Sequence, residues 1–397
     1  MKKKISILTP TISENAMGRA YLIAKLLQPK YSVTIVGNGS IENIWRPVKN
    51  DKTINYKLFK CDSVVDLFLK ANDIIDKCMI DSDLIYSIKP LLSSYGLGLI
   101  AKRKLKVPLI LDVDDWEIGF LLKKWHWELQ NGLKYYVNNL SSPFYTRILD
   151  KLCWCADFVT VSNSFLQEKY GGVWIPHARN EKHISIDQFD CFNKSLDQMK
   201  VVFLGTPRLH KGLDVLIAAW SKVNSANAKL YIIGVSPESD LYEYISRRGN
   251  SSIEVCGTVS MNEIPAILSS ASIIVIPQKL EKASVGQLPA KLIDAMAAGR
   301  AIISTEVNDI PMWLSCDAGI VVPPDDSDSL ARAINDLLED QDKRQLLGRN
   351  ARYKFIKYGS FAATVPRIEN LVSALILKKS YAPCSIDAVP NDLTRKN

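Results

Sequence analysis

The sequence has few of the residues that metal and redox sites need. It contains four histidines and eight scattered cysteines, and only Cys153 and Cys155 lie close together. No C-x-x-C pair occurs, and the histidines are not spaced with the cysteines as zinc ligands would be. A zinc site or a thiol redox motif is therefore not predicted. We interpret the cysteines as small buried hydrophobes in a reducing compartment.

The sequence also lacks a long hydrophobic run. No apolar stretch approaches the ~20 residues that a membrane-spanning helix needs. The first residues, MKKKISILTP, are basic, but the apolar run is too short for a signal peptide and no small-residue cleavage site follows. We therefore expect a cytoplasmic protein, with any membrane association being peripheral and on the inner face.

The charge imbalance is small. Lysine and arginine number 50 and aspartate and glutamate 42, which gives a net charge of +8. This excess suits an acidic ligand or an anionic membrane surface, whereas nucleic-acid binders concentrate their basic residues on one face. Nucleic acid is therefore not a predicted partner. With 47% hydrophobic and 23% charged residues, the chain is an ordinary globular one, and 397 residues suggest two or three domains.

Apolar runs alternate with helical patterns in the first half of the chain. Strands are expected at 5–9, 31–36, 83–88, 108–113, 158–162 and 173–176, with helices at 19–27 and 97–104. Such an alternation is typical of βαβ units with a parallel sheet.

The second half repeats this alternation. Strands are expected at 201–205, 229–234, 253–256, 273–277 and 301–304, and helices at 212–223, 241–248, 261–269, 291–298, 327–339, 342–355 and 361–377.

We therefore predict an α/β protein with two Rossmann-like, doubly wound domains facing a central cleft, where ligands bind outside the carboxyl ends of the strands. The predicted divisions are an acceptor-binding domain, a polar linker, a nucleotide-sugar-binding domain, a helix that packs back on the first domain, and a mobile tail. They comprise 1–180, 181–200, 201–360, 361–378 and 379–397, respectively.

The segment VFLGTPRLHKGLDVLI, residues 202–217, places Arg208 and Lys211 in a short loop between a strand and a helix. Two cations beside a helix N-terminus suit a diphosphate, because the amides donate hydrogen bonds and arginine can bind with two nitrogens. We expect Gly212 to let a phosphate approach the backbone. The alternative is a solvated basic turn.

The segment SVGQLPAKLIDAMAAGRAIIST, residues 284–305, leads from a loop into a helix. Lys291 and Asp294 are three residues apart and share one face of that helix. The loop can donate backbone hydrogen bonds to sugar or phosphate oxygens, and the carboxylate can accept from a ribose. The alternative is a helix with a routine surface ion pair.

Together these segments resemble glycosyltransferase family 4, the retaining GT-B glycosyltransferases. The family motif G-x-x-R-x-x-K-G-x-D-x-L-I falls on Gly205, Arg208, Lys211, Gly212 and Asp214. The resemblance implies that this motif clamps the diphosphate of a nucleotide-sugar donor.

The second family motif has two glutamates eight residues apart, followed by A-M-A-x-G. Asp294 matches the second glutamate, which implies that it binds the donor ribose, and Gly286 stands where the first glutamate would be. Backbone amides of the stretch from Gly286 to Pro289 are expected to replace the missing carboxylate. The implied donor site therefore includes Gly286, Gln287, Leu288, Pro289 and Lys291 as well.

Further segments extend the resemblance over most of the chain. CGTVSMNEIP implies that Val259 contacts the nucleotide base, and ADFVTVSNSFL with IPHARN resembles the pattern that ends the first domain. The family also places a glycine-containing loop, here around Gly18 and Arg19, close to the donor diphosphate. The alternative for that loop is an ordinary βα turn.

Asp112-Val113-Asp114-Asp115 looks like the D-x-D metal motif of the other main glycosyltransferase fold. Since it ends a strand of the acceptor half, away from the diphosphate clamp, no metal is predicted. Asp114 or Asp115 is instead a candidate base or hydroxyl ligand for the acceptor. His126, between Trp125 and Trp127, is a further acid–base candidate or an ordinary surface residue.

The stretch 116–154 mixes tryptophan, tyrosine and phenylalanine with lysine and arginine. This composition suits a bilayer interface and a lipid-linked acceptor. The alternative is a packed helical insertion, because aromatic residues also fill cores.

The resemblance thus implies a metal-independent hexosyltransferase that moves a sugar, with retention, from a nucleotide sugar to a hydroxyl of a sugar or lipid-linked acceptor. Polysaccharide, glycolipid or other glycoconjugate synthesis is the expected setting, and no cofactor is predicted. Two alternatives stay open. One is a sugar-nucleotide epimerase or sucrose-type synthase on the same fold, and the other is a non-catalytic scaffold subunit, which the missing glutamate favours.

Overall fold

The computed structural model describes residues 2–121, 137–183, 198–378 and 388–390, apart from 206–207, 225, 237, 240–241, 244, 246–251 and 261. Two compact units divide the chain. The N-terminal unit comprises Met1–His177 together with Thr364–Pro390, and the C-terminal unit is built from Ala178–Ala363. Most of the expected linker and of the expected mobile tail lies outside the described residues, as does most of the expected helix 241–248.

The N-terminal unit is built on a seven-stranded parallel sheet in the order β3-β2-β1-β4-β5-β6-β7. Its strands are β1 (Lys4–Thr9), β2 (Ser32–Asn38), β3 (Asn55–Phe59), β4 (Leu84–Ile88), β5 (Leu109–Val113), β6 (Phe158–Val161) and β7 (Val173–Trp174). Strands β4 and β5 are buried along their whole length, as expected for a parallel sheet covered on both faces.

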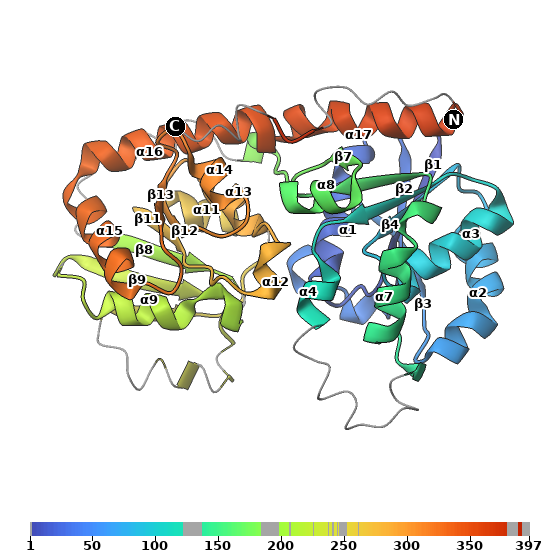
Figure 1. Cartoon of the computed structure of the whole chain (residues 1–397), viewed down its shortest axis with the longest axis horizontal. Coiled ribbons are helices and arrows are strands. Elements are labelled where there is room, and N and C mark those ends of the chain that lie inside the picture. Colours follow the sequence, from blue (N-terminus) through green and yellow to red (C-terminus); the bar gives the residue numbers. More distant parts are fainter. Residues whose placement is uncertain are drawn as a thin grey trace. The chain divides into compact units, whose positions relative to one another are not determined.

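Helices join these strands and cover the sheet (Figure 1). They are α1 (Ala16–Leu27), α2 (Val64–Cys78), α3 (Leu97–Leu105), α4 (Glu117–Leu121), α7 (Pro143–Lys151) and α8 (Ser164–Tyr170), with short 3-10 or π turns at Ile41–Asn43, Arg46–Val48, Leu92–Gly96 and Cys153–Cys155. Apolar side chains of α2, α3 and α7 form one core with the sheet. Ser63 caps α2 by accepting a hydrogen bond from the Asp66 amide at 3.1 Å.

The C-terminal unit is built on a six-stranded parallel sheet in the order β10-β9-β8-β11-β12-β13. Its strands are β8 (Met199–Leu204), β9 (Ala228–Ile233), β10 (Ile253–Cys256), β11 (Ile273–Ile276), β12 (Ala301–Thr305) and β13 (Ile320–Val322). The strand order reverses between β8 and β11, which is where doubly wound sheets bind ligands.

Two helices, α9 (Leu213–Trp220) and α15 (Ser327–Glu339), form a core with one face of this sheet. The other helices in the described part of the unit are α11 (Ile264–Ser269), α12 (Lys282–Val285), α13 (Ala290–Ala298), α14 (Ile310–Leu314) and α16 (Gln341–Lys354), with short turns at Glu181–His183, Leu209–Lys211 and Phe355–Gly359. Helix α13 ends at Gly299, whose φ of 63° is the expected left-handed cap.

The last helix, α17 (Phe361–Ile376), belongs from Thr364 onward to the N-terminal unit. Its Ser373 hydroxyl lies 2.7 Å from the Tyr31 hydroxyl, and the Arg367 guanidinium lies 4.7 Å from the centre of the Trp174 ring. These contacts attach the helix to β7 and to the chain just before β2.

One expected element boundary in the N-terminal unit is wrong. The sequence pattern indicated a loop around Gly18 and a helix from Arg19, but α1 already begins at Ala16. Gly18 therefore lies in the first turn of a helix, and an added Cβ there would be 3.2 Å from the Trp45 ring. Close packing against that ring is a structural reason for the glycine.

Candidate functional site

Gly205 forms the floor of a cationic site at the carboxyl end of β8. Its φ of 135° is rarely adopted by residues with a side chain. An added Cβ would lie 3.6 Å from Lys211 Nζ and 3.9 Å from Lys291 Nζ. The two lysines come from different segments, one just before α9 and the other from the first turn of α13. The structure thus brings together three of the predicted donor-site residues.

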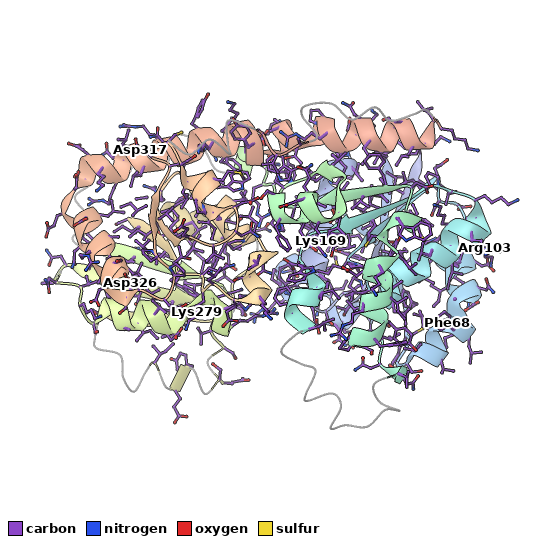
Figure 2. The ribbon with its side chains drawn as sticks, in the orientation of Figure 1. Phe68, Arg103, Lys169, Lys279, Asp317 and Asp326 are labelled. Atoms are coloured by element: carbon purple, nitrogen blue, oxygen red, sulfur yellow. The ribbon has the colours of Figure 1, made fainter. Side chains whose placement is uncertain are left out.

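Gly212 fixes the loop that carries Arg208 and Lys211. Its φ is 65°, and a Cβ there would overlap the Pro277 carbonyl oxygen. The Lys279 amide also donates to the His210 carbonyl at 2.9 Å. The glycine therefore allows two backbone segments to pack together, which is a different reason from the phosphate approach that the sequence suggested. Lys279, labelled in Figure 2, pairs through its ammonium with Asp214 at 2.6 Å.

Lys291 has an unusual environment. Its Nζ is buried, although the residue as a whole is half-buried, and no described residue accepts a hydrogen bond from it. The nitrogen lies 4.4 Å from the centre of the Phe203 ring, a favourable but weak contact. Burial, and secondarily the charge of Lys211, lowers the pKa of Lys291 well below its ordinary value.

Asp294 does not pair with Lys291, so the surface ion pair that the sequence left open is wrong. Its carboxylate accepts two hydrogen bonds from Arg179, from Nε at 2.5 Å and from a terminal nitrogen at 2.9 Å. Asp294 is only 8% exposed. Its role as a ribose ligand stays a prediction, and any ribose would share the carboxylate with Arg179.

His210 lies between Arg208 and Lys211, and the sequence pattern assigned it no role. It is 8% exposed, and burial, followed by the charges of Lys211 and Arg208, lowers its pKa to about 4. The imidazole is therefore neutral at pH 7. Arg208 itself is exposed and available to a ligand. The sequence feature that could have indicated His210 is its position between two basic residues of this loop.

The loop from Gly286 to Pro289 links α12 to α13. Gly286, Leu288 and Pro289 are buried, and the Gln287 amide donates to the Ser284 carbonyl at 3.1 Å. Pro289 has no N–H. The Gln287 and Pro289 backbones therefore have no spare hydrogen to donate, which limits the amides that could replace the missing glutamate. Val259 is half-buried in the loop after β10, and its contact with a base stays a prediction.

The N-terminal unit also holds buried charges, but these are paired. Arg19 Nε donates to Asp112 at 2.7 Å, and a terminal nitrogen of Arg19 donates to the other carboxylate oxygen at 2.9 Å. The Thr160 hydroxyl donates to Asp112 as well, at 2.7 Å. Both charged side chains are almost fully buried. Arg19 is therefore occupied inside its own unit.

Lys89 pairs with the other acidic residues that follow β5. Its Nζ lies 3.2 Å from Asp114, 2.7 Å from Asp115 and 2.5 Å from Glu117. Burial raises the pKa of Asp114 to about 7, against the opposing effect of Lys89. A carboxyl group that titrates near neutrality can exchange protons, so Asp114 remains a candidate base. Within the described residues, no group of three or more histidine, cysteine or carboxylate side chains could hold a metal ion.

The aromatic stretch 116–154 is only partly described. His126, Trp125 and Trp127 lie outside the described residues. Trp116 packs on Phe165 with ring centres 5.4 Å apart, whereas Phe144 and Trp154 are 43% and 78% exposed. The described part therefore contains both packed and exposed aromatics. No described helix has the length and apolar character to span a membrane.

Comparisons with known proteins identify similar sequences. The family model of Glycosyl transferases group 1 matches residues 198–340, which contain the cationic loop, α13 and β8. The chain is 25% identical to O-antigen chain mannosyltransferase C of Escherichia coli over 45% of its length and 47% of that protein. It is 30% identical to phosphatidyl-myo-inositol mannosyltransferase of Mycolicibacterium smegmatis over 45% of its length and 46% of that protein. The matches thus span about half the length of these relatives.

Solved structures match over nearly the whole chain. Anabaena Alr3699/HepE in complex with UDP and glucose has a TM-score of 0.70 at 15% identity and covers 94% of this chain and 100% of its own. Sucrose-phosphate synthase from Thermosynechococcus elongatus has a TM-score of 0.69 at 15% identity, covering 95% and 100%. Both sheets have the doubly wound parallel order, so the predicted fold class is confirmed. The chain has the GT-B fold of glycosyltransferases, and its residues 198–340 match Glycosyl transferases group 1.

Proposed function

We propose that the protein transfers a sugar from a nucleotide sugar to an acceptor hydroxyl. The observation that carries the proposal is the convergence of Lys211 and Lys291 on Gly205 at the switch point of the C-terminal sheet. Two lysine amines beside a residue without a side chain can both donate hydrogen bonds to a diphosphate. The structures and relatives similar to this chain include a UDP and glucose complex and two mannosyltransferases, which supports a nucleotide-sugar donor.

In the proposed reaction, the bond between the anomeric carbon and the diphosphate oxygen breaks, and a bond from the acceptor oxygen to that carbon forms on the same face. The acceptor proton passes to the leaving diphosphate. Negative charge grows on the diphosphate as the bond breaks, so Arg208 and Lys211 stabilise the transition state more than the bound donor. The overall result is retention, without a metal.

We propose glycoconjugate synthesis as the setting, with the N-terminal unit binding a sugar or lipid-linked acceptor. Asp114, with its pKa near 7, is an acid–base candidate in the described part of this unit. Exposed Phe144 and Trp154 offer a contact to an anionic membrane surface. Donor binding, which a catalytic role requires, is supported by the buried amine of Lys291, which has no structural partner among the described residues.

The test combines binding with turnover in EDTA. A thermal-shift panel of UDP-, GDP- and dTDP-sugars should raise the melting temperature with at least one member, because ligands that bind the folded state stabilise it. That donor is then incubated with acceptors in EDTA, and products are analysed by NMR for anomeric configuration.

The predicted product is an α-glycoside from an α-linked donor, formed without added metal. Loss of all turnover in EDTA with rescue by Mn²⁺ would contradict the metal-independent mechanism. Appearance of an epimerised sugar, free or still attached to the nucleotide, without an acceptor product would indicate an epimerase. Tight donor binding without any reaction would indicate a scaffold.

A further inference from the structure

The amine of Lys291 is the feature that the donor site alone does not explain. Three observations describe it: a buried nitrogen, no hydrogen-bond acceptor among the described residues, and a neighbouring cation in Lys211. The carboxylate of Asp294, one turn further along α13, accepts hydrogen bonds from two nitrogens of the Arg179 guanidinium. No carboxylate of the described chain therefore neutralises Lys291.

A buried ammonium without a counter-ion is costly, and proteins relieve the cost by releasing the proton. The Phe203 ring offers only a weak contact, and Lys211 repels a second positive charge. Burial and the charge of Lys211 both favour the neutral amine while the site is empty, and the weak ring contact opposes them only slightly. A diphosphate would reverse the balance, because it supplies oxygen acceptors and negative charge beside both lysines.

We propose that Lys291 is a proton-switched ligand of the donor diphosphate: its amine is neutral in the free protein and takes up one proton from solvent when the diphosphate binds. The inference rests on the proposed function, because it needs the diphosphate to bind above Gly205. The N–H bond forms at Nζ, and the proton comes from water or buffer. Departure of the nucleoside diphosphate releases the proton again.

The charged groups of this region do not supply a counter-ion. Lys211, from the loop before α9, acts directly on Lys291. His210 interacts electrostatically with Lys211, Arg208, Glu281 and Lys291, and Asp294 on α13 is bound by Arg179. From α16, Arg352 donates to the Ala297 carbonyl near the far end of α13. His210 could also take up a proton. Burial lowers its pKa to about 4, and a bound diphosphate would raise that pKa again.

The consequence is a donor affinity that depends on pH. Between the pKa of free Lys291 and its higher pKa in the complex, each binding event takes up a proton, so affinity increases as the pH falls.

The stability of the empty protein depends on pH in the opposite direction. The unfolded chain binds the extra proton over the range between the lowered pKa and the ordinary one, so this group makes the empty protein more stable as the pH rises there.

Calorimetric titration tests the proposal. UDP-glucose and GDP-mannose are titrated into the full chain at pH 8 with EDTA, in two buffers of different ionisation enthalpy. Their diester phosphates do not titrate near this pH, so proton exchange reports on the protein. The wild type should take up a measurable fraction of a proton per donor bound, and the binding enthalpy should differ between buffers.

Variants identify the group. Lys291→Met should abolish the uptake and weaken donor binding about 10- to 100-fold, as expected for loss of a charged hydrogen bond. It should also raise the melting temperature of the empty protein. Lys291→Arg keeps a fixed charge and should bind without uptake. The matched control is Lys282→Met on the neighbouring α12, an exposed lysine whose loss should leave both readouts unchanged.

The outcomes separate two failures. If neither donor binds the wild type, the proposed function fails. If a donor binds without proton uptake, the proposal for Lys291 fails while the donor site stands. If uptake persists in Lys291→Met, the proton goes to another group, with His210 first in line, and the proposal is also overturned.

Discussion

The two units treat their buried cations differently. In the N-terminal unit, Arg19 meets Asp112, and Lys89 meets three carboxylates within 3.2 Å. In the C-terminal unit, the buried amine of Lys291 meets no acceptor among the described residues. Both sets lie near the carboxyl ends of strands in parallel sheets. Arg19 and Lys89 are thus paired within their own unit, whereas Lys291 lacks an acceptor in the described part of the chain. In our proposal, a bound ligand supplies that acceptor.

Breaking the N-terminal pair should give the largest effect. Arg19→Met leaves Asp112 buried without its cation, and it should lower the free energy of unfolding by about 3–5 kcal/mol in urea denaturation. The control is Lys3→Met, which removes an exposed pair with Asp83 and should cost about 0–1 kcal/mol. Equal decreases in the free energy of unfolding for the two variants would show that the buried pair contributes no more to stability than the exposed pair does.

Removing the cations of the loop between β8 and α9 should impair catalysis rather than folding. Arg208→Ala and Lys211→Ala should each lower kcat by about 10²-fold, and more than they raise the donor KM, because the charge on the diphosphate grows in the transition state. Arg208→Lys should recover little, because lysine lacks the two-nitrogen fork. Lys222→Ala, an exposed lysine paired with Asp328, serves as the control. Near-normal transfer in the double alanine variant would refute the donor-site assignment.

Asp294 and Arg179 can be separated by comparing two variants. Asp294→Ala should weaken donor binding by about 1.5–3 kcal/mol if the carboxylate accepts from the ribose. Arg179→Met keeps the carboxylate and should weaken binding less. Both affinities are measured by calorimetry, with urea denaturation to monitor folding. Unchanged donor affinity in Asp294→Ala would reduce its role to that of a partner for Arg179.

The smallest effect is expected at a membrane. Exposed Trp154 and Phe144 lie in the N-terminal unit, so the protein should sediment with acidic liposomes at low salt, and less so at high salt. Trp154→Ser should reduce sedimentation more than Tyr353→Ser, which removes an exposed aromatic from the C-terminal unit. Absence of sedimentation at low salt would favour the packed-insertion interpretation of 116–154.

Much of the sheet structure could be predicted from the sequence, because the central strands are continuous apolar runs. The expected helix 327–339 coincides with α15, whose polar face and Asp326 cap are both visible in the sequence. The expectations passed over β3, β13, α2 and the shorter helices α4, α7, α8, α12 and α14. Strand β3, NYKLF, lies at the edge of the sheet and alternates exposed and half-buried residues, so no apolar run marks it. Helix α2 is amphipathic, but its outer face carries Phe68 and Leu69, which blur the period; Figure 2 labels Phe68 on this helix.

The charged residues of the candidate site could be predicted from the sequence, but their ion-pair partners could not. Local spacing placed Arg208, Lys211 and Lys291 at the carboxyl end of one sheet. The spacing of Lys291 and Asp294 also suggested a local ion pair, but Arg179, which is 115 residues away in sequence, takes that carboxylate. Long-range pairing depends on tertiary structure, which helical spacing alone does not reveal. The isolation of Lys291, on which the further inference depends, therefore emerged only from the structure.

A crystal structure with bound UDP or GDP tests the central claim most directly. The account predicts a diphosphate above Gly205, with its oxygens within hydrogen-bonding distance of Lys211 Nζ and Lys291 Nζ, and without a metal ion between them. A nucleotide bound elsewhere, or a diphosphate that leaves Lys291 without an acceptor, would contradict it.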